Sequence, residues 1–181
     1  MRNIFKLASL FVIMLLVIIS SCKKEEEIIE GCSDSAAMNF QSAATSNDGS
    51  CIYAYDVAIG TWSIDPDCDD VDILGQTISL NEQMPETIDV QENGDNSLFI
   101  DMNGSQVEGN IDNEGNILVN EQTISVDFSG IPIPVQVSGT GKIESENSGY
   151  MDLTYSGEID IIPNMPIPIS FSTTCHIVLS K

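Results

Sequence analysis

The chain has 181 residues, enough for one ordinary domain with appended segments, and its 28 acidic and 6 basic side chains give a formal net charge of −22. Beyond Lys24 only Lys142 and Lys181 are basic, so no surface of the protein can neutralise phosphates, and nucleic acid is excluded as a partner. Direct docking on anionic lipid headgroups is disfavoured for the same reason.

The first segment, residues 1–21, has the pattern of a secretory signal peptide. A short basic start precedes an apolar run from Leu7 to Ile19. At about 13 residues this run is too short to span about 30 Å of hydrocarbon comfortably, which favours an export signal over a membrane helix. The segment ends in Ile18-Ile19-Ser20-Ser21-Cys22, an order that resembles the lipobox of bacterial lipoproteins.

The resemblance implies cleavage before Cys22, thioether lipidation of that cysteine and acylation of its new amino group, for example with palmitate. Residues 22–30 then form a lipidated acidic tether, and its charged start, Lys23–Glu27, resembles the export signal of Bacteroidota surface lipoproteins. Position 23 is not Asp, so the usual inner-membrane retention signal is absent. Because several acyl chains anchor a protein stably, we expect an outer-membrane lipoprotein held by Cys22 and exposed at the cell surface. An ordinary signal peptide with an incidental cysteine is the alternative.

Four cysteines remain after lipidation of the first: Cys32, Cys51, Cys68 and Cys175. They allow three pairings, and the cell envelope is oxidising enough for disulfides to form. We favour Cys32–Cys51, which closes a compact segment, and Cys68–Cys175, which ties the start of the following domain to its last strand. A zinc site is the rival interpretation, but the chain has no Cys-x-x-Cys spacing and its only histidine is His176.

Residues 31–55 contain Gly31-Cys-Ser-Asp34, an Ala-x-Asn-aromatic step that ends at Phe40, and Asp48-Gly-Ser-Cys51. This order resembles a short cysteine-framed module of secreted Bacteroidota proteins, and the resemblance implies no activity. A disulfide there would replace a hydrophobic core that so short a segment cannot build. Asp34 and Asp48, with the amide of Asn39, are possible calcium ligands, although turn formation is the simpler role for them.

Residues 56–181 alternate between apolar and polar side chains, which predicts an antiparallel β domain with its apolar face inward. The alternation is longest in 131–143, 151–161 and 165–179, where the odd-numbered residues are mostly apolar. Shorter strands are expected at 57–64, 72–80, 87–91, 97–102, 106–111, 116–119 and 122–128. Hairpin turns are expected at Asn93-Gly94, Asn103-Gly104 and Glu114-Gly115. The total is eight to ten strands and no convincing helix.

The domain opens with Gly60-Thr61-Trp62, and this Gly-x-Trp on a first strand, followed by a β-meander, resembles the lipocalin-like barrels. The resemblance implies that Trp62 closes the barrel floor and that a basic residue after the last strand, here Lys181, packs across it. The family's second motif, Thr-Asp-Tyr, is absent. A β-sandwich with Trp62 as its large core residue remains the alternative architecture.

The densest acidic stretch contains Asp65, Asp67 and Asp69, which suggests a loose calcium site. An EF-hand that starts at Asp65 fails, because positions 70 and 76 hold Asp and Gln instead of Gly and Glu. A solvated acidic loop is the alternative interpretation. No other cofactor is indicated.

Catalytic motifs are missing from the sequence. There is no Gly-x-Ser-x-Gly elbow, no cysteine remains free, and His176 is expected on the polar face of its strand. We therefore expect a non-enzymatic, lipid-anchored envelope protein whose barrel binds a small apolar ligand, with inward Gly139, Gly141 and Gly157 either leaving room or allowing close backbone approach. The alternatives are a structural or adhesion-type surface β-sandwich without a cavity and, less favoured, a glycan-active enzyme.

Overall fold

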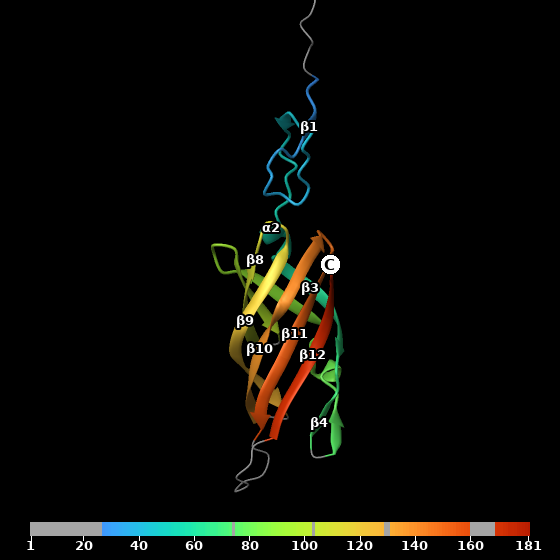
Figure 1. Ribbon diagram of the computed structural model, residues 1–181, viewed down its shortest axis with the longest axis vertical. Coiled ribbons are helices and arrows are strands. Elements are labelled where there is room, and N and C mark those ends of the chain that lie inside the picture. Colours follow the sequence, from blue (N-terminus) through green and yellow to red (C-terminus); the bar gives the residue numbers. More distant parts are fainter. Residues whose placement is uncertain (1–26, 74, 103, 129–130, 160–168) are drawn as a thin grey trace, which may run out of the picture.

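A computed structural model describes residues 27–73, 75–102, 104–128, 131–159 and 169–181 (Figure 1). The predicted signal peptide and the lipidation site Cys22 lie outside the described residues. Within the described ranges, no helix is both long enough and apolar enough to cross a membrane.

Eight antiparallel strands close into a barrel, so the predicted all-β barrel is confirmed and the sandwich alternative is wrong. Each strand pairs with the next one along the chain, and the last pairs with the first, Cys175 lying opposite Cys68. The barrel strands are β3 (Gly60–Cys68), β6 (Thr87–Glu92), β7 (Ser97–Met102), β8 (Ser105–Ile111), β9 (Asn116–Phe128), β10 (Ile131–Ser145), β11 (Ser148–Ile159) and β12 (Ile169–Ser180).

The barrel core is built by the alternation seen in the sequence. In β10, β11 and β12 the odd-numbered apolar side chains point inward, and Val137, Leu153 and Ile177 are almost completely buried. Burying each such side chain contributes roughly 1.5–3 kcal/mol, which drives closure of the barrel. The even-numbered Pro132 and Pro134 are exposed near the start of β10, before its pairing with β11 begins at Val135, so the missing backbone N–H costs little there.

Strand β9 joins two segments that the sequence pattern predicts as separate strands. Val119 pairs with Gly139 and Gln122 with Val137, so Asn120 and Glu121 together form a bulge. A bulge inserts one extra residue and reverses which positions face inward. In β9 the odd-numbered side chains are therefore buried inside the barrel before the bulge. After the bulge the even-numbered side chains face inward, beginning with Ile124.

Two expected strands are wrong in extent. Residues 57–58 belong to the short helix α2 (Ala54–Ala58), whose Ala54 and Ala58 are buried one helical turn apart. The expected strand 72–80 is a hairpin instead, made of β4 (Val71–Ile73) and β5 (Gln76–Ile78) and followed by the 3-10 turn η1 (Asn81–Gln83). Gly75, at φ +81°, provides the left-handed backbone that reverses the chain there.

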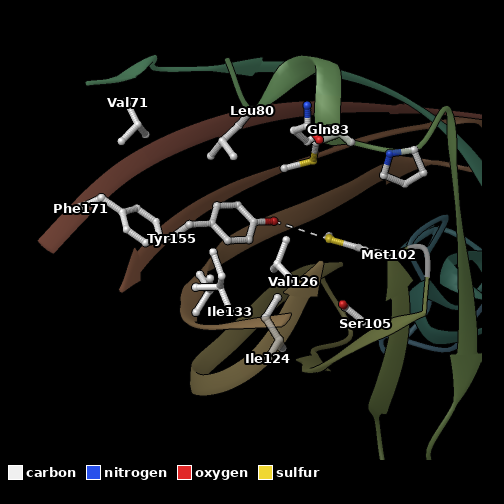
Figure 2. A pocket seen from close by; sticks show the side chains of 13 residues that line it. Val71, Leu80, Gln83, Met102, Ser105, Ile124, Val126, Ile133, Tyr155 and Phe171 are labelled. Carbon is white, nitrogen blue, oxygen red and sulfur yellow. Dashed lines mark hydrogen bonds between the residues drawn. The ribbon is translucent and has the colours of Figure 1, made fainter. Parts of the chain in front are cut away.

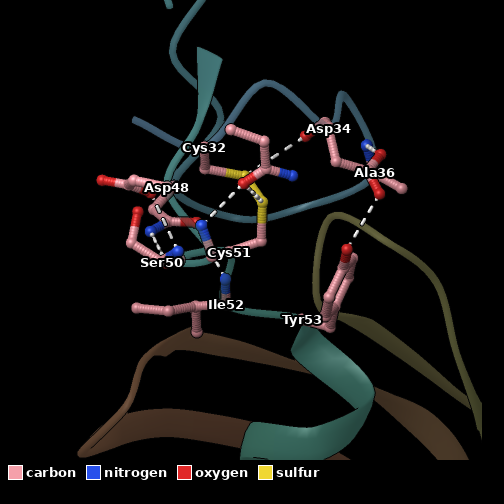
Figure 3. Close-up of a disulfide and its surroundings, with 11 residues drawn as sticks. Cys32, Asp34, Ala36, Asp48, Ser50, Cys51, Ile52 and Tyr53 are labelled. Atoms are coloured by element: carbon pink, nitrogen blue, oxygen red, sulfur yellow. Dashed lines mark hydrogen bonds between the residues drawn. A yellow bond between two sulfur atoms is a disulfide. The ribbon is translucent and has the colours of Figure 1, made fainter. Parts of the chain in front are cut away.

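The small segment before α2 is held by the predicted Cys32–Cys51 disulfide (Figure 3). Its strand β1 (Glu30–Gly31) pairs in parallel with β2 (Ser46–Asn47). The second predicted disulfide, Cys68–Cys175, is also present and joins β3 to β12 inside the barrel wall. Both favoured pairings are therefore confirmed. Helix α2 crosses the expected boundary between residues 55 and 56 and connects the module directly to the barrel.

Candidate functional site

One end of the barrel is closed by Trp62. Its side chain is fully buried, and its indole Nε1 donates a hydrogen bond to the Ala58 carbonyl at 2.8 Å. The Lys181 Nζ lies 4.4 Å from the centre of the Trp62 ring and donates to the carbonyls of Val57 (2.6 Å) and Ile59 (2.9 Å). Partial burial lowers the pKa of Lys181. The packing of Lys181 across Trp62 that we expected from the sequence is thus present. It lies at the end of the barrel where α2 and the C-terminus are found, toward the module (Figure 1).

The other end of the barrel holds a cavity of about 180 Å³ (Figure 2). Its walls come from the far halves of the barrel strands and from the segment around η1, which lies over one side. Thirteen side chains line it: Val71, Leu80, Gln83, Met84, Pro85, Met102, Ser105, Ile124, Val126, Ile133, Val135, Tyr155 and Phe171. Trp62 is at the opposite end and takes no part in this lining.

The cavity wall is apolar, with three polar side chains at its surface. The Tyr155 hydroxyl donates to the Met102 sulfur at 3.5 Å, and the Ser105 hydroxyl donates to the Ser125 carbonyl at 2.6 Å. Burial raises the pKa of Tyr155, so its phenol is neutral at every physiological pH. None of the lining residues that the structure describes is charged. Such a surface favours an uncharged, largely apolar occupant.

Part of the cavity wall is a seam between β8 and β9. Near the closed end, backbone pairing joins Asn110 to Leu118 and Ile111 to Ile117. Beyond the bulge, the Gln122 side chain bridges the strands, because its Oε1 accepts from the Glu108 N–H at 2.9 Å and its Nε2 donates to the Glu108 carbonyl at 2.7 Å. A side chain therefore replaces the ladder hydrogen bonds beside the cavity.

The inward glycines do not create this space. A Cβ on Gly139 would collide with the backbone oxygen of Asp152, and one on Gly141 would lie 2.6 Å from the Tyr150 oxygen. The place of a side chain on Gly157 is taken by the Phe171 ring. The interpretation that these glycines leave room for a ligand is wrong, and the alternative of close approach is confirmed.

The three aspartates of the acidic stretch that were considered as calcium ligands lie on the outside of the barrel. Asp65 and Asp67 are exposed on β3, and the carboxylate of Asp69 accepts a hydrogen bond from Thr174 at 2.6 Å. In the part of the chain that the structure describes, no three His, Cys, Asp or Glu side chains are grouped closely enough to hold a metal ion. Calcium binding at these residues stays a prediction.

The carboxylates of the module are engaged in turns (Figure 3). Asp34 accepts hydrogen bonds from the Ala36 N–H at 2.9 Å and from the Tyr53 hydroxyl at 2.8 Å, and these bonds lower its pKa. Asp48 accepts from the Ser50 N–H at 2.9 Å, and hydrogen bonds with Ser50 lower the pKa of Asp48 as well. Both aspartates thus hold local loop geometry.

The only histidine is on the outer face, as its strand position predicts. The His176 side chain is 51% exposed, and its Nδ1 lies 2.6 Å from the Asp152 carboxylate. The two residues are opposite each other on β12 and β11. The sequence pattern did not reveal this pair, because finding it requires the register between the strands.

The residues that line the cavity were also missed by sequence reasoning, which expected a ligand inside the barrel but named no lining residue. Leu80, Gln83 and Met84 follow the hairpin that was predicted as a continuous strand, so their position over the barrel was not foreseen. The apolar character of Leu80 and Met84 was the only available signal.

No protein-family model matches this chain, and no match was found among curated proteins or among solved structures.

Proposed function

We propose that this protein is a non-enzymatic, lipid-anchored component of the bacterial outer membrane whose barrel binds a small apolar ligand. The observation that carries the ligand proposal is the uncharged cavity of about 180 Å³ at the end of the barrel away from Trp62. An engineered apolar cavity of about 150 Å³ is enough to bind benzene, so the space suits one ring or a short acyl segment.

The lining supports reversible binding, and the position of the cavity fits a protein anchored at its other end. Met84 and Met102 belong to its lining, and methionine side chains adapt their shape to a guest. The cavity also lies at the far end of the barrel from the module, as Figure 1 shows by the position of β4 relative to β1. A protein anchored through Cys22 would therefore present its cavity away from the attached membrane.

The ligand proposal is tested with the mature chain carrying Cys22→Ser, which retains every described residue and no acyl chain. The probe is isopropylbenzene, and binding is followed by NMR. We expect saturable binding at one site in the protein that carries Cys22→Ser alone. Val126→Trp, which fills the cavity, should weaken binding at least tenfold. Val178 is 46% exposed, so Val178→Trp on the outer face is the matched control and should bind normally.

The outcomes separate the candidate functions. Equal binding by both tryptophan variants would place the probe outside the cavity and contradict the proposal. No binding by the protein that carries Cys22→Ser alone would favour a structural or adhesion-type surface protein. Circular dichroism must show cooperative unfolding of both variants before their affinities are compared.

The anchor is tested in cells. An alkyne-labelled palmitate should be incorporated into the wild-type protein and not into Cys22→Ser. Equal labelling of the two proteins would contradict lipidation of Cys22.

A further inference from the structure

The Tyr155 hydroxyl is a poorly satisfied donor inside the apolar cavity. The residue is 6% exposed, and the acceptor of its hydroxyl is the Met102 thioether sulfur at 3.5 Å (Figure 2). Thioether sulfur is a weak acceptor, whereas a hydroxyl bonded to oxygen lies about 2.7–2.8 Å from it. An oxygen acceptor that enters the cavity would therefore offer this phenol a better partner than it has.

Neither of the other polar side chains in the lining competes for this role. The Ser105 hydroxyl already donates to the Ser125 carbonyl at 2.6 Å. Gln83 is exposed on η1, where its amide is accessible to water. The donor directed at a buried ligand is therefore that of Tyr155.

The charge distribution excludes a buried anion. The two lysines after the tether lie near the closed end. Lys181 covers Trp62. Lys142 is three residues before Ser145, which is joined through Ser148 to Ser180, the neighbour of Lys181. Along β10, Lys142 is about 23 Å from Val135 of the cavity wall, at about 3.3 Å per residue. A carboxylate in the cavity would have no cationic partner among the described residues, and burying an unpaired carboxylate is very unfavourable.

From these observations we infer that the cavity selects an uncharged apolar molecule that carries a carbonyl or ether oxygen, and that Tyr155 is the residue that recognises this oxygen. The inference rests on the proposed ligand-binding function and names the chemical class of the ligand. It distinguishes neutral carbonyl compounds both from plain hydrocarbons, which leave the phenol on its weak sulfur acceptor, and from carboxylates.

The test uses three probes of similar shape: acetophenone, isopropylbenzene and benzoate. With the mature Cys22→Ser chain, acetophenone should bind about 3- to 10-fold more tightly than isopropylbenzene, the range expected for one net hydrogen bond. Benzoate should bind at least tenfold more weakly than acetophenone. Tyr155→Phe should remove the preference for acetophenone and leave isopropylbenzene within about twofold.

Two further variants sharpen the result. Tyr150→Phe makes the same change on the outer, polar face of β11 and should alter none of the affinities. Met102→Leu removes the competing sulfur at similar volume, so it should increase the preference for acetophenone. These opposite effects are not expected from a merely structural Tyr155.

Isopropylbenzene binding without any preference for acetophenone, or an equal loss of both ligands in Tyr155→Phe, would overturn the inference while leaving the proposed function intact. Absence of binding by all three probes would overturn the proposed function, and the inference with it.

Discussion

Lys181 is the residue on which closure of the barrel end depends most directly. Its ammonium group satisfies two carbonyls of the chain that enters the barrel, at Val57 and Ile59, and lies over Trp62. A single side chain at the last position of the chain thus joins the first strand, the last strand and the end of α2. Hydrogen bonds from a charged group to carbonyls are worth about 1.5–3 kcal/mol when buried and less when exposed to water.

We expect Lys181→Met to lower the free energy of unfolding by about 1–2 kcal/mol, because it removes both hydrogen bonds and the cation–π contact while keeping the aliphatic stem. Urea unfolding followed by Trp62 fluorescence measures this change. Lys142→Met is the matched control, because it alters the net charge equally without touching Trp62. If the two variants lose the same stability, the effect comes from overall charge repulsion and not from closure.

Asp34 and Tyr53 join the loop of the module to the residue that precedes α2. Their hydrogen bond lowers the pKa of Asp34 and raises that of Tyr53. An acid with a lowered pKa stabilises the fold above its ordinary value of 3.8 and loses this contribution as the pH falls through the folded value. The phenol contributes below pH 10.0, and its contribution is lost as the pH rises through its own raised value. The link is therefore intact between these limits.

A carbon-13 NMR titration of the Asp34 carboxyl tests this link. In the wild-type protein we expect a midpoint below 3.8, and Tyr53→Phe should move it upward. The midpoint should still remain below the ordinary value, because the Ala36 N–H, the largest cause of the shift, is unaffected. An unchanged midpoint in Tyr53→Phe would mean that the phenol does not bond to the carboxylate in solution.

At the scale of elements, the seam between β8 and β9 is the weak part of the barrel wall. Beyond its two backbone-paired positions it is bridged by side chains, Gln122 to Glu108 and Ser105 to the Ser125 carbonyl, whereas β11 and β12 are joined by a regular ladder. We expect Gln122→Leu to accelerate hydrogen exchange of the Glu108 amide at least tenfold and to destabilise the protein by about 0.5–1.5 kcal/mol. The same substitution at exposed Gln136 on β10 should change stability by less than about 0.5 kcal/mol.

Equal protection of the Glu108 amide in wild type and Gln122→Leu would show that water or a shifted backbone replaces the bridge. Faster exchange across all of β8 and β9 would instead show that Gln122 holds the two strands together as a unit. Both measurements come from one exchange experiment on the intact protein.

The long strands were predictable because burial on one face imposes period two on every residue they contain. Val137, Leu153 and Ile177 reveal both the strands and their inward face. The bulge at Asn120 and Glu121 appeared in the sequence as a break in alternation, but a break is equally compatible with a turn. Only the pairing of β9 with β10 distinguishes the two.

The closed end was predictable and the open end was not. Trp62 and Lys181 carry a recognisable pattern, and both lie where that pattern implies. The cavity has no such signature, because Ile124 or Val126 would be equally apolar in a filled core. An internal space depends on how the hairpin and η1 settle over the barrel, which is a property of tertiary packing and not of local sequence.

At the scale of the whole molecule, the two disulfides stabilise two different bodies. The module has little core, with Cys32 and Ala37 as its buried hydrophobic side chains among the described residues. The barrel has a continuous core that extends from Trp62 to Tyr155. Since a segment without a core depends on its cross-link, folding of the module should require its disulfide, whereas the barrel should still fold without its own.

We therefore expect Cys32→Ser with Cys51→Ser to unfold the module alone, seen as rapid hydrogen exchange in residues 31–53, with the barrel's urea midpoint nearly unchanged. Cys68→Ser with Cys175→Ser should instead lower the unfolding free energy of the barrel by about 2–5 kcal/mol, because this bridge closes a loop across 107 positions of sequence.

Binding of isopropylbenzene by the first double variant connects this prediction to function. The cavity draws its whole lining from residues after Cys68, so an unfolded module should leave the affinity unchanged. Loss of binding in that variant, with the barrel still folded, would mean that the module acts on the cavity through α2. Unchanged binding would show that the barrel binds the ligand independently of the module.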